Sequence, residues 1–155
     1  MVNERLADDG LPPAITTDII CGFPTETKED FEKTVQIAEQ VGYLHMHVFP
    51  YSVRTGTAAA RWKQLPPEII QNRVQTLLNL DSALSLAFRS QLIGRRVTIM
   101  IEQLAEKEGC MRGRCGHYAD ITIQTDAEQG ELIEAQVTQA DDRGTYAMST
   151  INVLH

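Results

Sequence analysis

The hydrophobic positions of the first third of the chain follow a strand, then a helix, then a second strand. Residues 14–21 (AITTDIIC) are rich in β-branched side chains, which predicts a buried strand. Apolar residues then recur at helical spacing over 31–41, after the capping-box pair Thr27 and Asp30. The short apolar run 44–50 predicts another strand. Such a βαβ unit implies parallel strands joined by a right-handed crossover.

A long amphipathic helix is predicted next. It follows a loop over 51–65 and opens at Pro66 and Pro67, where the missing N–H groups cost little. One apolar stripe continues to Leu92, and Gly94 ends the pattern. The polar face is not rich in Lys and Arg, so the stripe indicates core packing and not a helix on a membrane surface.

From Arg95 onward the hydrophobic period changes from helical to two. Val97, Ile99 and Ile101 alternate with Thr98, Met100 and Glu102. Further strands are predicted over 118–124, 132–138 and 145–154, separated by turns. Short strands at regular spacing indicate a small β-barrel of the kind that binds oligonucleotides. The sequence therefore predicts an α/β part, 1–93, followed by an all-β part, 94–155.

Composition and charge narrow the class of protein. The chain has 155 residues, of which 43% are hydrophobic and 23% are charged, as in globular domains. No apolar run approaches the roughly 18 residues of a membrane span, and no signal peptide is recognisable, so a cytoplasmic protein without a membrane partner is expected. The net charge of −7 argues against tight non-specific binding of nucleic acid but allows a local basic patch.

Cysteine and histidine spacing gives only weak signals for metal binding. Three cysteines in a chain without a secretion signal do not indicate a disulfide framework. Cys110 and Cys115 could form a metal or redox pair, but loop thiols without further ligands are the simpler interpretation. His45 and His47 lie on one side of the second strand, and a satisfied polar pair is favoured over a metal site. No metal site is predicted.

The α/β part contains only two predicted parallel strands. Parallel strands are normally covered on both faces within a larger sheet, and two alone leave unpaired edges. Residues 2–13 further resemble the end of a helix and a turn. This part is therefore expected to belong to a larger barrel.

Two motifs carry a resemblance to a known family. The segments ITTDIICGFPTETKEDF (15–31) and HVFPYSVRTGTAAAR (47–61), followed by a long helix and a β-rich tail, resemble the radical-SAM methylthiotransferases. The nearest likeness is to the branch that modifies threonylcarbamoyladenosine in tRNA. The tail resembles the RNA-binding TRAM domain. The resemblance implies the last strand–helix units of a partial TIM-type radical-SAM barrel, followed by a small OB-like TRAM β-barrel.

The resemblance implies an S-adenosylmethionine site at the carboxyl ends of the barrel strands. The residues at matching positions are Gly22, Phe23, Pro24, Glu26, Val48, Phe49 and Arg54. Physically, Gly22 admits a close approach of the backbone to a ligand, and Glu26 can accept a hydrogen bond from an amine or a ribose. Arg54 can offer a forked donor to a phosphate or carboxylate, or can face solvent. The family usually has glycine in place of Thr25, and a rigid turn is the alternative interpretation.

The tail supplies candidate RNA contacts. These are Arg95, Arg112, Arg114, His117 and Tyr118, with Arg96 beside the first. Arginine pairs with phosphate, and an aromatic ring can stack on an unpaired base. The alternative is that Arg95 and Arg96 only flank a strand and that Tyr118 belongs to the core.

Family members hold a 4Fe-4S cluster through a CxxxCxxC motif, and this chain has no such motif. No catalytic residue is therefore expected, and the chain alone is expected to be inactive. Activity is expected to require a missing N-terminal portion or a partner chain. The reaction implied for the complete enzyme adds a methylthio group to a modified adenosine of tRNA, with S-adenosylmethionine and 4Fe-4S clusters as cofactors. A non-enzymatic TRAM-type RNA-binding module and a split half that needs a partner remain alternatives.

Overall fold

The structure, a computed structural model, describes residues 10, 11 and 13–150 in two compact units. The first unit comprises residues 15–85, and the described part of the second comprises residues 10, 11, 13, 14 and 86–150. The elements are β1 (Thr16–Cys21), α2 (Lys28–Val41), β2 (His45–Pro50), η1 (Ala59–Arg61), α3 (Pro67–Ser90), β3 (Arg96–Leu104), β4 (Cys110–Cys115), β5 (Asp120–Gln124), β6 (Leu132–Asp141) and β7 (Gly144–Ser149). Most of the predicted helix end at 2–13 lies outside the described residues.

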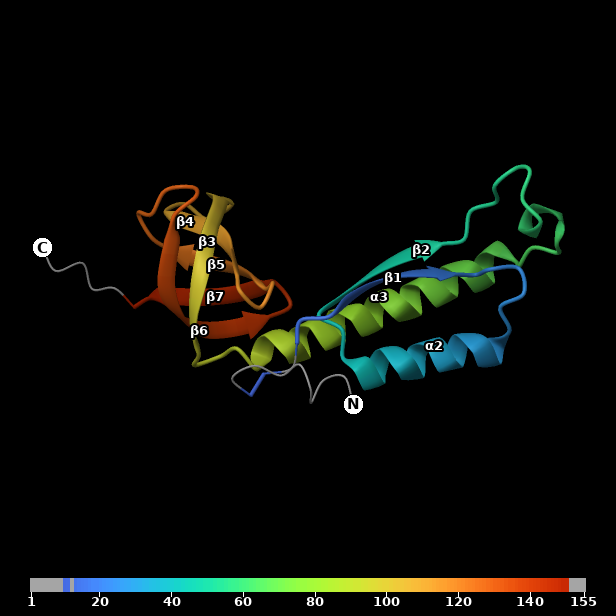
Figure 1. The fold of residues 1–155 in the computed structure, drawn as a ribbon, viewed down its shortest axis with the longest axis horizontal. Helices are drawn as coiled ribbons and strands as arrows, with labels where there is room; N and C mark the ends of the chain where they lie inside the picture. The colour runs from blue at the N-terminus through green and yellow to red at the C-terminus, as the bar shows by residue number, and fades with distance from the viewer. Residues whose placement is uncertain (1–9, 12, 151–155) are drawn as a thin grey trace, which may run out of the picture. The chain divides into compact units, whose positions relative to one another are not determined.

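The first unit is a βαβ unit followed by most of the long helix α3. Strands β1 and β2 are parallel, as predicted, with Thr16 opposite His45 at one end and Cys21 opposite Pro50 at the other. Helix α2 begins at the capping box of Thr27 and Asp30, in which each side chain accepts a hydrogen bond from the other residue's backbone N–H. Both helices lie on the same side of the sheet (Figure 1).

The two faces of this small sheet differ in exposure. Cys21 and Met46 point toward the helices and are buried. Ile20 and Phe49, which are register partners, point the other way and are exposed. The described residues therefore present an open sheet face that carries large apolar side chains. Whether this unit belongs to a larger barrel stays a prediction of the sequence.

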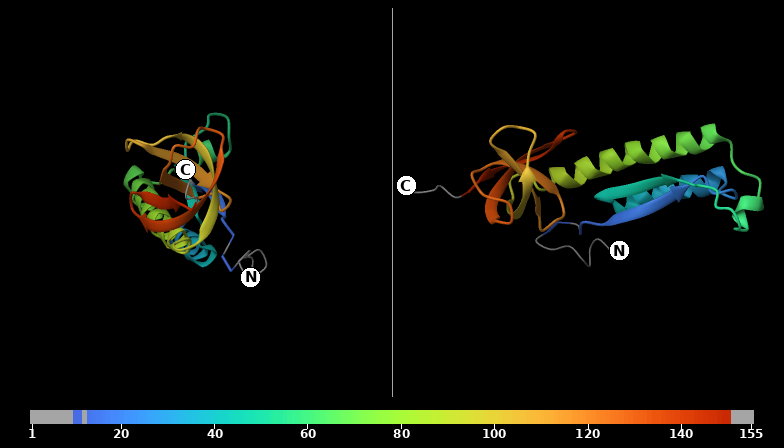
Figure 2. Two further views of the ribbon diagram at one scale, coloured as in Figure 1. Left: turned by 90° about the vertical axis from the view of Figure 1, so that its left-hand side faces the viewer. Right: turned by 90° about the horizontal axis from the view of Figure 1, so that it is seen from above.

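The second unit contains a closed five-stranded barrel, as the alternating pattern predicts. The strand order is β3-β4-β5-β7-β6, in which β5 and β7 are parallel and the other pairs are antiparallel. A five-stranded Greek-key barrel of this kind is OB-like. Figure 2 shows the strands wrapped around a common interior. The interior is filled by side chains that include Ile99, Ile101, Ile121, Ile123 and Val137.

Strand β4 corrects the sequence interpretation, which placed Cys110 and Cys115 in a loop. Both cysteines lie on this strand and are buried. The hydrophobic pattern failed here because Arg112, Gly113 and Arg114 occupy the middle of the strand. Pairing with β3 and β5, and not the strand's own apolar residues, determines its conformation.

The bounds of two other predicted strands also change. The strand expected from Tyr118 begins at Asp120. Tyr118 itself has a φ of 59°, a left-handed conformation that does not occur in a strand. Strand β7 ends at Ser149, and residues 151–155 lie outside the described part. Among the described helices, none is both long and apolar enough to cross a membrane.

Candidate functional site

The turn after β1 is held close to helix α3 at Gly22. This glycine has a φ of 84°, and a Cβ atom placed on it would lie 2.8 Å from Cγ1 of Ile70. The sequence suggests that the missing side chain admits a ligand. The structure shows that Ile70 fills that space, so the glycine is required by packing within the protein.

Glu26 and Arg73 connect this turn to α3 by a network of hydrogen bonds. The backbone N–H of Gly22 donates to Oε2 of Glu26 at 2.7 Å, and Arg73 forms an ion pair with the same oxygen. Arg73 also donates to the carbonyl oxygens of Glu26 and Thr27, both at 3.1 Å. The side chains of Glu26 and Arg73 are only 13% and 10% exposed. One carboxylate oxygen of Glu26 is therefore already engaged by two protein donors.

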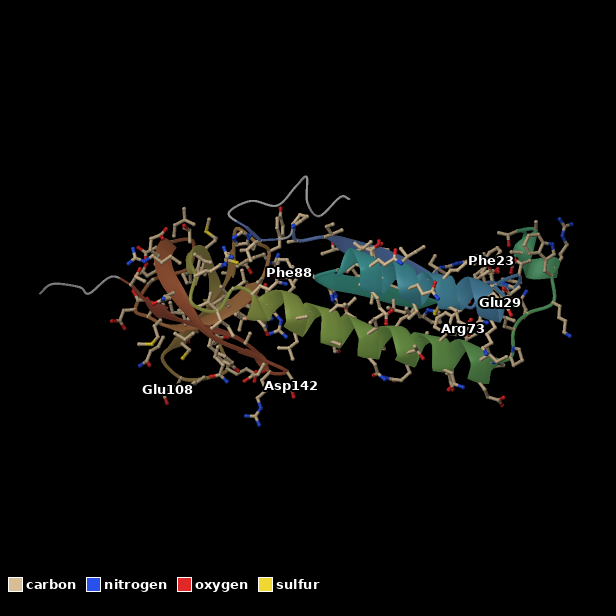
Figure 3. The ribbon with its side chains drawn as sticks, turned by 90° about the horizontal axis from the view of Figure 1, so that it is seen from below. Phe23, Glu29, Arg73, Phe88, Glu108 and Asp142 are labelled. Atoms are coloured by element: carbon tan, nitrogen blue, oxygen red, sulfur yellow. The ribbon has the colours of Figure 1, made fainter. Side chains whose placement is uncertain are left out.

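Arg73 also contacts an aromatic ring. Its guanidinium lies over the ring of Phe31, 5.2 Å from the centroid. Nothing in the sequence marks Arg73 as a partner of Glu26, because it lies on the polar side of the long helix and 47 positions away. Figure 3 shows Arg73 and Phe23 at the same end of the first unit.

Cys21, the last residue of β1, is not suited to act as a thiolate. Burial raises the pKa of its thiol, and the nearby carboxylate of Glu26 raises it further. The neutral thiol is therefore the favoured form, and it packs in the interior of the first unit.

The predicted cofactor residues of β2 point in opposite directions. Phe49 lies on the open face of the sheet, whereas Val48 is half-buried on the face covered by the helices. Of these two residues, Phe49 therefore shares the open face with its register partner Ile20, and Val48 does not. Alternation along a strand explains this separation.

The loop after β2 brings three aromatic rings together. Tyr51 donates its backbone N–H to the carbonyl oxygen of Cys21 at 2.8 Å, so the loop starts beside the end of β1. The ring of Phe23 packs edge-on against Tyr51 and Trp62, with centroids 5.2 and 5.8 Å apart. Pro24 is half-buried in the same turn, and Arg54 is exposed on the loop. Trp62 was not among the predicted site residues.

The histidine pair on β2 is engaged by protein groups. Nδ1 of His45 lies 3.1 Å from Oδ2 of Asp81, and Oδ1 of Asp81 accepts the backbone N–H of Met46 at 2.6 Å. The ring of His47 packs edge-on against His45. This arrangement fits the polar pair that the sequence favours. Within residues 10, 11 and 13–150, no group of three potential metal ligands is found.

On the barrel, Arg112 and Arg114 share one carboxylate. Arg112 donates through Nη2 to Oδ2 of Asp120 at 3.0 Å, and Arg114 donates through Nε to Oδ1 at 3.0 Å. The hydrogen bond that Arg114 donates to Asp120, reinforced by the negative charge of that carboxylate, raises the pKa of Arg114. The three side chains are about half exposed. Because two arginines share one carboxylate, the pair presents roughly one unneutralised positive charge to solvent.

In the connection between β4 and β5, the aromatic ring of Tyr118 is exposed to solvent. Tyr118 is the one non-glycine residue of the described chain with a positive φ, and its side chain is 69% exposed. The alternative that Tyr118 belongs to the core is therefore wrong. A backbone conformation of this kind costs about 1–3 kcal/mol and is often found at functional sites. His117 beside it is half-buried.

Arg95 lies apart from the paired arginines. It precedes β3, and its Nε donates to the carbonyl oxygen of Gln91 at 3.2 Å. Arg114 lies opposite Met100 in the sheet, and Met100 is five residues after Arg95 in the chain. Five residues of extended strand span about 17 Å. The structure therefore does not bring Arg95 into the Arg112–Arg114 cluster.

The fold and these sites define a class of protein in which a βαβ unit and a long helix precede an OB-like barrel. No family model matches the chain. Over most of its length, however, the chain is homologous to the methylthiotransferases. The resemblance inferred from the two sequence motifs is therefore confirmed at the level of this family.

Three relatives illustrate the match. A tRNA-2-methylthio-N(6)-dimethylallyladenosine synthase of Desulfitobacterium hafniense is 36% identical over 131 residues, which are 83% of this chain and 29% of that protein. A protein of the same name from Saccharopolyspora erythraea is 34% identical over 164 residues, 97% of this chain and 32% of the relative. The ribosomal protein uS12 methylthiotransferase RimO of a Synechococcus species is 36% identical over 155 residues, 90% and 34% of the two chains. The chain thus spans about a third of the length of these curated relatives.

Proposed function

We propose that this chain contributes to a methylthio-transfer reaction as part of a radical-SAM methylthiotransferase, with an α/β part at the S-adenosylmethionine site and a TRAM-type barrel that holds RNA. The observation that carries the proposal is the homology to methylthiotransferases across both units. The proposed boundary between the two parts remains near Gly94.

The first unit fits part of an S-adenosylmethionine site. Ile20 and Phe49 offer an exposed apolar surface on the open sheet face, which suits the flat ring of adenine. Gly22, Phe23 and Pro24 would border it through the strand-end turn. Glu26 fits a positioning role better than direct binding, since Gly22 and Arg73 already donate to it. S-adenosylmethionine would supply the methyl group of the reaction, while these residues bind and orient it.

The cysteines of the chain do not fit a 4Fe-4S cluster. Cluster binding requires several thiolates that converge on one site. Cys21 ends β1 in the first unit, whereas Cys110 and Cys115 lie on β4 in the second, and all three are buried. No step of the reaction is therefore assigned to a cluster held by these residues.

The proposed RNA contacts of the second unit are Arg112, Arg114, His117 and Tyr118, with Arg95 further along the barrel surface. The exposed ring of Tyr118 supports base stacking, and the two paired arginines support contact with phosphate. A tRNA adenosine beside the anticodon is the proposed substrate. The names of these relatives refer to dimethylallyladenosine in tRNA and to ribosomal protein uS12. The choice of the threonylcarbamoyladenosine branch therefore rests on the sequence motifs alone.

A second candidate function is a role that depends on another polypeptide segment. The described residues of the first unit contain two parallel strands, each with an unpaired outer edge. Such edges are normally covered in folded proteins. This observation favours a unit completed by further strands, supplied by the same protein or by a partner chain, over an independent RNA-binding module.

A chimeric enzyme tests the proposal. The chain replaces the 131-residue matching segment of the Desulfitobacterium relative, and the nucleosides of tRNA are measured by mass spectrometry in cells that lack their own enzyme. We expect methylthio-modified adenosine with the wild-type chain. A matched chimera with Phe49→Ala should lose most of the product while remaining folded, because Phe49 is exposed. A soluble, folded chimera that yields no modified nucleoside contradicts the proposal.

A further inference from the structure

The loop between β2 and α3 is basic in an otherwise acidic chain. Between Glu39 and Glu68 the sequence contains no aspartate or glutamate, but it contains Arg54, Arg61 and Lys63. All three basic side chains are exposed. The chain as a whole has a net charge of −7, so this segment is a local departure from the average.

The basic side chains of this loop are not neutralised by nearby carboxylates. No ion pair of Arg54, Arg61 or Lys63 occurs among the residues that the structure describes. The barrel arginines differ, since Arg112 and Arg114 both pair with Asp120. The loop therefore offers a greater unneutralised positive charge to a polyanion than the barrel cluster does.

Aromatic rings lie directly beside these charges. Trp62 stands between Arg61 and Lys63, and its ring packs edge-on against Phe23 at an interplanar angle of 88°. Trp62 is 46% exposed and Phe23 is 37% exposed. Edge-to-face packing leaves part of a ring face available, and a ring face is what an unpaired base stacks on.

The loop has an ordered backbone around Trp62. Gln64 donates through Nε2 to the carbonyl oxygens of Ala59 and Trp62, both at 2.9 Å. The hydroxyl of Thr57 donates to the carbonyl oxygen of Arg54 at 2.8 Å. These bonds order the backbone that carries Arg54, Arg61 and Trp62, which reduces the ordering cost of binding.

We propose that this loop surface, formed by Phe23, Tyr51, Arg54, Arg61, Trp62 and Lys63, binds single-stranded RNA. A base stacks on the aromatic rings, and the basic side chains contact the flanking phosphates. S-adenosylmethionine is a poor match for the three basic side chains, because it has no phosphate and carries a positive sulfonium. The choice of RNA rests on the proposed function. The surface shares Phe23 with the turn assigned there to S-adenosylmethionine, but it shares no residue with the barrel.

Trp62 provides a direct test, because it is the only tryptophan of the chain. The full chain is titrated with a uridine decamer, and Trp62 emission and the anisotropy of a labelled decamer are followed together. We expect stacking to quench Trp62 emission. For single strands, the slope of the logarithm of the binding constant against the logarithm of the salt concentration is about −0.7 per neutralised phosphate. Three phosphate contacts therefore predict a slope of about −2.

Two charge-matched variants separate the loop from the barrel. Arg61→Ala/Lys63→Ala should weaken binding about tenfold and flatten the salt slope, whereas Arg112→Ala/Arg114→Ala should retain the quenching of Trp62. Circular dichroism checks folding, and Arg61→Gln/Lys63→Gln replaces the first variant if it fails to fold. The proposal is overturned if decamer binding leaves Trp62 emission unchanged or if the loop variant binds as the wild type does. If only the barrel variant loses binding, the loop assignment is wrong and the proposed RNA role of the barrel stands. If the wild-type chain binds no RNA, both RNA assignments are contradicted.

Discussion

Arg73 and Glu26 form an almost buried ion pair that fastens the turn after β1 to helix α3. The same carboxylate accepts the backbone N–H of Gly22, and the guanidinium donates to two carbonyl oxygens of the turn. The proposed cofactor turn therefore keeps its shape through a residue of a different element. Arg73 is a positioning residue, since it acts on the site through Glu26.

Removing one partner of this pair should destabilise the first unit. For Arg73→Met we expect a loss of about 3 kcal/mol in the free energy of unfolding, because the carboxylate of Glu26 remains with its main charged partner removed. Urea unfolding followed by Trp62 emission reports on this unit. The double variant Glu26→Gln/Arg73→Met should lose less than the sum of the two single variants. Additive losses, or a cost below about 1 kcal/mol for Arg73→Met, would show that the pair does not hold the turn.

The local elements were predictable because their signals lie within a few residues. Thr27 and Asp30 mark the start of α2, and Gly42 marks its end with a left-handed φ of 67°. The change of hydrophobic period after Gly94 predicts the barrel, since alternate residues of β3 fill its interior. Patterns of period 3.6 and 2 report directly on which side chains are buried.

Contacts between distant residues were not predictable in the same way. Nothing near Glu26 in the sequence indicates Arg73, and nothing near Arg112 indicates that Asp120 neutralises it together with Arg114. Strand β4 also gave no periodic signal, because its conformation depends on its neighbours. The candidate cofactor residues were chosen by position in a motif and the candidate RNA residues by residue type in the tail. Their hydrogen-bond partners required the three-dimensional structure.

Gly113 should be the most restrictive glycine of the barrel. A Cβ atom at this position would lie 2.2 Å from the carbonyl oxygen of Met100 and 2.7 Å from Cγ2 of Ile99. Gly113→Ala would force β3 and β4 apart, and overpacking in a tight interior typically costs about 1–3 kcal/mol or more. We expect faster amide hydrogen exchange throughout β3 and β4, measured by NMR.

Gly116 provides the matched control for that substitution. No atom lies within 4 Å of a Cβ atom placed there. Gly116→Ala should therefore change the stability of the barrel by less than about 0.5 kcal/mol. Equal effects of the two substitutions would show that the close approach at Gly113 does not limit the strand pairing.

The capping box predicts a pH dependence of the first unit. A hydrogen bond from the side chain of Thr27 holds the pKa of Asp30 below its ordinary value, and the backbone N–H of Thr27 contributes in the same direction. A carboxyl with a lowered pKa in the folded state stabilises the protein above its unfolded pKa, and this contribution is lost as the pH falls through the folded value. Asp30→Asn should therefore be less stable than the wild type at pH 7, and the difference should shrink below about pH 4. Thermal unfolding by circular dichroism between pH 7 and pH 2.5 measures it, and a difference that is constant with pH would contradict this role of the carboxylate.

The three thiols should be protected in the folded chain and accessible only after unfolding. Cys21 is 0% exposed, and Cys110 and Cys115 are each 4% exposed. Burial also raises the pKa of Cys21, which lowers the fraction of reactive thiolate at neutral pH. With Ellman's reagent at pH 7.5, we expect slow labelling of the native chain and rapid labelling of three thiols per chain in guanidinium chloride. Rapid labelling of one native thiol would identify a local opening, and a Cys21→Ala variant would decide whether it occurs at β1. A native chain in which Cys110 or Cys115 reacts at the unfolded rate would contradict the placement of β4 in a closed barrel, since both thiols depend on that strand for protection.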